Sequence, residues 1–261
     1  MADRLEHLAD DRSRPMPAPP PVLPSRAELD SLVINVELTL TSIIQGVALS
    51  FLCENAHEPL VSLRWEIWPF LLNGLLLIFL FWSRSIGHTL TVIRWPLDFS
   101  HNFLYIGAVL LESVIFTQVN NPVAWFTFLT LFSLLVWILF VTDQRLIRNR
   151  EREYRGTAWE SLLAQVKADQ RLNIFLLVPL LFTFHLICAV VIAESQPGIR
   201  PLVVWICVVA QFVSFFGYLI YLLRFLARLA LHAQPVAEER RGETATEPSS
   251  VPRRRDYGAA S

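Results

Sequence analysis

The side chains of this chain that could do chemistry are ionisable groups inside long apolar runs, and Glu112 is the foremost of them. Such a group is costly in the hydrocarbon of a membrane, so it marks a functional site by default. Asp98, His101, Tyr105, Ala108 and Glu112 recur at steps of three or four residues, which places them on one face of a helix. From His101 to Glu112 the stripe extends about 16 Å along the helix axis. The spacing predicts a polar path from one membrane face to about mid-depth.

Polar residues in three other apolar runs are predicted to lie at the depth of Glu112. Counted from the same membrane face, Gln45, Glu112, His185 and Gln211 come within roughly 5 Å of one another in depth. Glu37 is shallower, about two helical turns before Gln45. We hypothesise that Glu112 forms a hydrogen bond with His185 inside a helix bundle, as part of a polar layer near the membrane midplane.

The same residues have a purely structural interpretation. Hydrogen bonds between transmembrane helices often serve only to hold the helices together, and each contributes about 0.6–2 kcal/mol. For the amides Gln45 and Gln211 we favour this structural role. For Glu112 with His185 a functional role is favoured, because an ionisable group costs more to bury than an amide does.

Six long apolar runs supply the elements that must position these residues. Each run is close to the roughly 20 residues with which a helix crosses a hydrocarbon core of about 30 Å. A hydrophobic fraction of 54% agrees with a membrane protein and is hard to reconcile with a soluble domain containing six such runs. The predicted fold class is therefore all-α, a polytopic integral membrane protein with six transmembrane helices. The runs are about 32–52, 67–82, 99–117, 123–142, 174–193 and 202–223, within a transmembrane domain of residues 31–230.

Basic residues alternate between the segments that separate these runs. The two tails together with the second and fourth loops hold 20 of the 22 Lys and Arg residues, and the other three loops hold 2. Because basic loops stay in the cytoplasm, this asymmetry predicts that both termini are cytoplasmic. The expected location is the cell membrane, plasma or inner, with the lipid bilayer as the main partner.

Three segments outside the runs differ in composition. Residues 1–30 and 231–261 are rich in Pro, Glu, Arg and Ser, which is typical of disordered tails. The loop 143–173 is strongly charged and is predicted to form two helical pieces with a break at Gly156. Its second piece, about 157–170, is amphipathic. That piece would lie on the inner membrane face or pack on a protein partner, or else it is a solvated connector.

Several classes of site are not expected. The pairs Glu54-x-x-His57 and Asp98-x-x-His101 fall on opposite membrane faces, so they cannot share a di-metal site. The sequence also lacks the Gly-x-Ser-x-Gly, His-Glu-x-x-His and phosphate-loop signatures. We therefore expect no enzyme activity, metal, cofactor or nucleic-acid partner. An intramembrane enzyme is a minor alternative, with His88, His101 and Asp98 as its only candidates.

The leading functional expectation is a channel or transporter for an ion, a proton or a small solute. The midplane layer and the His101–Glu112 stripe would provide its polar path. Six helices need a second copy to enclose a route, so a homo-oligomer is expected. The alternative is a non-catalytic sensor, scaffold or accessory subunit that acts through a protein partner at the charged loop 143–173.

Overall fold

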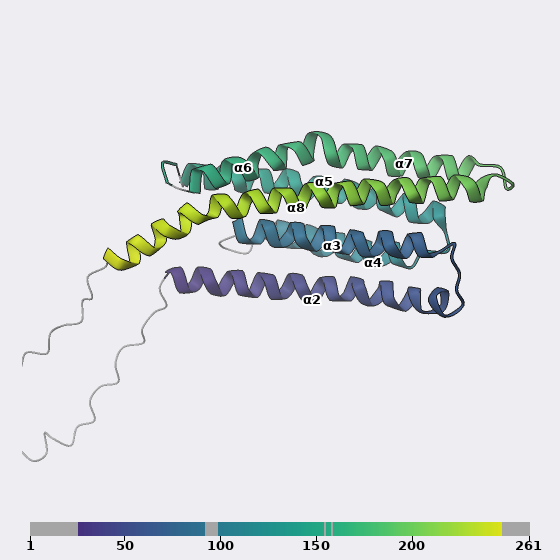
Figure 1. The fold of residues 1–261 in the computed structure, drawn as a ribbon, viewed down its shortest axis with the longest axis horizontal. Coiled ribbons are helices and arrows are strands. Elements are labelled where there is room, and N and C mark those ends of the chain that lie inside the picture. Colours follow the sequence, from purple (N-terminus) through teal and green to yellow (C-terminus); the bar gives the residue numbers. More distant parts are fainter. Residues whose placement is uncertain (1–25, 92–98, 154, 158, 247–261) are drawn as a thin grey trace, which may run out of the picture.

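The protein is a bundle of long helices that lie side by side along one axis (Figure 1). The computed structural model describes residues 26–91, 99–153, 155–157 and 159–246, and within these ranges there are helices and no strands. Asp98 lies outside the described residues. The elements are α2 (Arg26–Val61), α3 (Trp68–Thr91), α4 (Phe99–Phe116), α5 (Pro122–Glu153), α6 (Trp159–Leu172), the π-helix η1 (Asn173–Leu177), α7 (Val178–Glu194) and α8 (Arg200–Thr246).

Length and composition make this a multi-pass membrane protein. Five helical stretches of the described chain are long and apolar enough to cross a membrane, and α4 contributes a shorter apolar helix over Ser100–Phe116. Large apolar side chains stand exposed on the outer faces, such as Phe175 at 78% and Phe103 at 68%. Lipid would cover these side chains. The five stretches are Ile34–Val61, Trp68–His88, Pro122–Asn149, Trp159–Glu194 and Arg200–Leu231.

The two ends of the bundle differ, and we name them for what lies there. At the hairpin end, short turns join α2 to α3, α4 to α5 and α7 to α8; at the tail end, α2 begins and α8 leaves the bundle (Figure 1). A side chain and a proline define the start of α5. The side-chain oxygen of Asn121 accepts a hydrogen bond from the backbone N–H of Ala124 at 3.2 Å, and Pro122 occupies the first helical position.

Aromatic side chains fill the core near the hairpin end. Phe116, Trp125 and Phe126 are fully buried, and the Trp125 ring meets the ring of Phe70 edge to face at 5.3 Å. The Trp125 indole N–H donates to the side-chain oxygen of Gln211 at 3.1 Å. We call Phe116, Trp125 and Phe126 the aromatic plug, because these three rings close the interior of the bundle at this end.

Gly74 of α3 allows a close helix contact beside the aromatic plug. A Cβ atom at this position would lie 2.9 Å from Leu52 Cδ1 and 3.0 Å from Phe116 Cε1. Gly74→Val is therefore expected to lower the free energy of unfolding by about 1–3 kcal/mol, as overpacking does. Reversible unfolding in mixed micelles measures the change. Gly46→Val is the control, because a Cβ on Gly46 meets nothing within 4 Å; equal losses in both variants would contradict the explanation.

The charged segment 143–173 does not form a separate loop. Helix α5 continues to Glu153, Gly156 with its φ of 80° breaks the helix, and α6 then runs through η1 into α7. The two helical pieces and the break were predicted from the sequence. The apolar side of the second piece does not lie on the membrane surface or in solvent, however. Its residues Leu162, Leu163 and Val166 are buried within the chain. Helix α6 packs on α5, α8 and α3.

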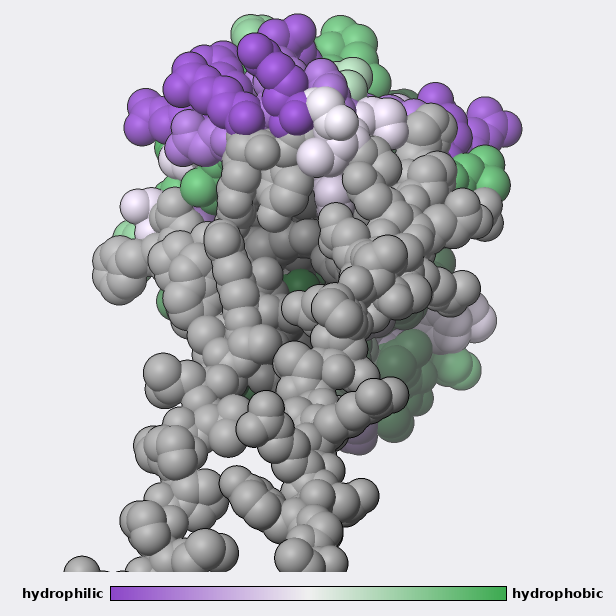
Figure 2. All heavy atoms as spheres, turned by 90° about the vertical axis from the view of Figure 1, so that its left-hand side faces the viewer, coloured by the Kyte–Doolittle hydropathy of each residue, from purple (hydrophilic) through white to green (hydrophobic). Residues whose placement is uncertain are grey.

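Hydrophilic side chains nevertheless gather on part of the tail end. Figure 2 views this end and shows them at the top, over α5 and α6.

Helix α8 continues to Thr246, into the segment 231–261 for which we expected disorder. Helix α2 begins at Arg26, inside the segment 1–30.

Candidate functional site

Six ionisable side chains converge in the tail-end half of the bundle, and each is at most 6% exposed. They come from five helices, α2 to α6. Taking a charge out of water costs several kcal/mol unless a partner and hydrogen bonds compensate it, so the pairings at this site decide whether the bundle is stable. The six are Glu37, Arg84, His88, His101, Asp143 and Asp169.

Asp143 of α5 joins two histidines from two other helices. Its carboxylate lies 2.7 Å from Nδ1 of His101 on α4 and 3.1 Å from Nδ1 of His88 on α3. An ionised carboxylate only accepts hydrogen bonds, so both Nδ1 atoms act as donors. On the other side of His101, Glu37 of α2 interacts with the imidazole electrostatically. We call Glu37, His101, Asp143 and His88 the His–Asp chain; its members come from α2, α4, α5 and α3 in that order.

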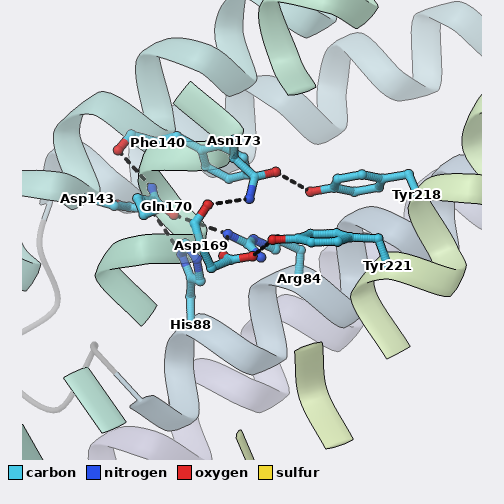
Figure 3. Close-up of polar contacts among 9 residues, drawn as sticks. All are labelled: Arg84, His88, Phe140, Asp143, Asp169, Gln170, Asn173, Tyr218 and Tyr221. Carbon is cyan, nitrogen blue, oxygen red and sulfur yellow. Dashed lines mark hydrogen bonds and ion pairs between the residues drawn. The ribbon is translucent and has the colours of Figure 1, made fainter. Parts of the chain in front are cut away.

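Arg84, one helical turn from His88 on α3, holds a second group of residues. Its Nη2 forms an ion pair with Asp169 of α6 and donates to the side-chain oxygen of Gln170 at 3.2 Å. The guanidinium lies over the rings of Phe140, at 5.1 Å, and Phe225, at 5.6 Å. Figure 3 shows Arg84, Asp169 and Gln170 pointing toward one another. A charged pair, a hydrogen bond and two ring faces together offset the cost of burying this arginine.

The ion pair is extended to α8 by two tyrosines. The Tyr221 hydroxyl donates to Asp169, and the Tyr218 hydroxyl donates to the side-chain oxygen of Asn173 at 2.7 Å. Asn173 in turn donates to the backbone oxygen of Asp169 at 2.8 Å (Figure 3). Asn173 is also the first residue of η1, and single-turn π-helices occur often at functional sites.

The predicted stripe on α4 faces a matching stripe on α2. Tyr105 and Glu112 are buried against α2, where Gln45 is the polar neighbour that acts on both. Gln45 is close enough to act on both as a hydrogen-bonding neighbour, but no side-chain polar atom of Glu112, Gln45 or Tyr105 has a well-formed hydrogen bond within the described chain. We call Glu112, Gln45 and Tyr105 the polar seam. It runs from mid-helix on α4 toward His101 and Glu37 at the tail end.

Glu112 and His185 do not form the predicted hydrogen bond. His185 Nδ1 pairs with the Ser133 hydroxyl at 3.1 Å, while Glu112 has no such partner among the residues placed by the structure. The cause is the packing: α4 lies against α2 and α5, whereas α7, which carries His185, lies against α5 and α8. Gln211 of α8 accepts a hydrogen bond from Trp125 of α5 instead. The expected midplane layer is therefore divided between two seams of the bundle.

Sequence reasoning missed three central residues. All three were assigned to segments between the spans: Arg84 and Asp143 lie just past the end of an apolar run, and Asp169 lies in the charged loop 143–173. A signal was available for Asp143: it follows Phe140 and precedes Ile147 at helical spacing, and both of these side chains are buried. No comparable signal pairs Arg84 with Asp169, which is 85 residues away.

The site and the fold together define a class: a multi-pass helical membrane protein with a buried chain of ionisable residues at one end of its bundle. Among the residues that the structure describes, no three His, Cys, Asp or Glu side chains are grouped to hold a metal ion. The chain matches no family model, no curated protein and no solved structure.

Proposed function

We propose that the protein carries protons through the membrane, or couples their movement to that of a small solute, with Glu112 as the central proton-accepting group. The observation that supports this most is the polar seam. It places buried carboxyl, amide and phenol groups in sequence from Glu112 to the His–Asp chain, with Gln45 as the polar neighbour of both Glu112 and Tyr105. Buried groups of this kind are typical of proton relays.

The His–Asp chain would supply the seam with protons. Imidazole is the side chain that gains and loses a proton most readily near neutral pH, and here two imidazoles share one carboxylate. His101 also lies next to Glu37 and begins the stripe that leads to Glu112. The aromatic plug lies beyond Glu112 toward the hairpin end, so protons that reach Glu112 need a helix movement to leave on that side.

The remaining features of the proposal follow from charge and size. The uneven distribution of Lys and Arg supports a cytoplasmic tail end, with both termini inside and the chain in the plasma or inner membrane. A homo-oligomer is proposed because the helices of one copy are too few to enclose a wide route for a solute. No catalytic role is proposed for these residues.

A second candidate function, a sensor or scaffold, is supported by the hydrophilic surface over α5 and α6 (Figure 2). Here Lys167 donates to Glu151, and this hydrogen bond lowers the pKa of Glu151 below its usual value. Such a surface suits a protein partner of complementary charge. A pull-down whose bound partner is lost when the exposed residues of 145–171 are replaced, with the buried Leu162, Leu163, Val166 and Asp169 kept, would favour this function.

Proton flux in proteoliposomes tests the leading proposal. A potassium gradient with valinomycin sets the voltage, and a pH-sensitive dye inside the vesicles records the uptake of protons. We expect uptake well above that of protein-free vesicles, reversing in direction with the voltage. When a pH gradient replaces the voltage, proton uptake should again exceed that of protein-free vesicles. Uptake equal to that of protein-free vesicles at both polarities would overturn the proposal.

A further inference from the structure

A small cavity lies in the half of the bundle that the polar seam does not use. It is enclosed by α3, α5, α7 and α8, and its volume is about 60 Å³. Arg84 and Tyr218 line it toward the tail end, while His185 and Ser133 line it nearer the middle of the helices; the other walls are apolar. This space suits a head group of a few atoms, because one water molecule takes about 30 Å³.

Two of the side chains that line this cavity have polar atoms without a hydrogen-bond partner in the described chain. Arg84 uses only Nη2 for Asp169 and Gln170, and its Nε and Nη1 have no hydrogen-bond partner in the described chain. His185 uses Nδ1 for Ser133, and no described residue pairs with its Nε2. Arg84 is 4% exposed and His185 is 1% exposed. Buried donors of this strength are rarely left without an acceptor, so an oxygen atom is the expected complement.

The cavity adjoins a groove on the outer surface of the bundle. Leu181 and Tyr218 line both, and the groove continues between α7 and α8 with a volume of about 430 Å³. Gly217 on its floor has no side chain, and the exposed side chains around it, such as Leu180 at 62%, are apolar. An alkyl chain in the surrounding bilayer therefore fits this groove.

We propose that the cavity and the α7–α8 groove bind a lipophilic molecule with a neutral carbonyl group at the end of an alkyl chain. The carbonyl oxygen accepts a hydrogen bond from Nη1 of Arg84, and the chain lies in the groove. A neutral head fits better than an anion, because Asp169 already balances the charge of Arg84 and a second buried anion would be uncompensated. A ketone, an aldehyde and a protonated carboxylic acid share this chemistry. The inference does not rest on proton transport.

Photolabelling in nanodiscs tests the site. The probe is a twelve-carbon methyl ketone with a diazirine next to the carbonyl, and the matched control is the same diazirine hydrocarbon without the oxygen. We expect the ketone to label the peptide around Leu77–Arg84 and that around Val136–Phe140, about tenfold more than the hydrocarbon does, as a charge-assisted hydrogen bond implies. Decanoic acid and decyl aldehyde, compared as competitors at acidic pH, separate the ligand classes. Stronger displacement of the ketone by the acid favours a protonated carboxylic acid, and stronger displacement by the aldehyde favours a ketone or an aldehyde.

A pair of variants separates the cavity from the general lipid surface. Leu181→Trp fills the junction between cavity and groove and should reduce the ketone labelling about tenfold, whereas Val190→Trp, on the exposed side of α7, should leave it unchanged. Equal labelling by ketone and hydrocarbon, or labelling that Leu181→Trp does not change, would overturn the proposal. Proton flux is a separate measurement, so a failure of the ligand site leaves the proton proposal standing, and the reverse also holds.

Discussion

Replacing Arg84 by methionine is expected to lower the free energy of unfolding by about 3–5 kcal/mol. The substitution keeps an unbranched apolar side chain but removes the only cation that pairs with Asp169 among the described residues. Asp169 would then be a buried anion with only the hydroxyl of Tyr221 as a donor. An uncompensated charge in the interior of a bundle costs more than the lost contacts alone. Reversible unfolding in mixed micelles, followed by circular dichroism, measures the change.

A double substitution distinguishes loss of the ion pair from loss of packing. Arg84→Met combined with Asp169→Leu removes both charges and should recover most of the loss, because replacing a buried pair by apolar residues is often close to neutral. Arg224→Met is the matched control: this residue is exposed near the same end of the bundle, and its change should stay within about 0.5 kcal/mol. If the double variant is as unstable as Arg84→Met, the charge of Asp169 is not the cause.

The sequence was sufficient to predict the polar face of α4. Steps of three and four residues select His101, Tyr105 and Glu112, and the structure places all three on the buried side of that helix. The stripe of Glu37 and Gln45 on α2 is buried as well. Periodicity succeeds here because a polar side chain in a lipid-exposed position would be unpaired, so a helix that carries a polar stripe turns it toward its neighbours.

Which helices face each other could not be predicted in the same way. Depth along the membrane normal follows from counting residues, but it says nothing about the position of a helix around the bundle. Glu112 and His185 were assigned similar depths, yet α5 packs on both α4 and α7 and the two residues belong to different seams. The ion pair of Arg84 with Asp169 was missed for a related reason: a charge at the end of an apolar run is indistinguishable from one in a loop until its partner is known.

Replacing Glu112 by glutamine is expected to reduce proton flux to the level of protein-free vesicles while the protein remains folded. Glutamine has nearly the shape of glutamate, but an amide does not gain or lose a proton in the physiological range. Because Gln45 is the polar neighbour of Glu112, an amide at position 112 can form an amide–amide hydrogen bond with it. The free energy of unfolding should therefore stay the same or rise by about 1 kcal/mol. Flux in proteoliposomes and unfolding in micelles measure the two effects on one protein sample.

Comparison with two further variants decides between proton transport and a structural role for the polar seam. Asp143→Asn leaves Glu112 in place but removes the charge that both histidines share, so we expect slower flux with an altered pH dependence. Glu112→Ala removes the carboxyl group and leaves a space, so it should lose both flux and stability. If the seam only holds α2 to α4, Glu112→Gln will retain full flux and Glu112→Ala will change stability alone. Loss of flux in Glu112→Gln without loss of stability is a result that a purely structural role does not produce, since the substitution preserves both volume and hydrogen-bonding capacity.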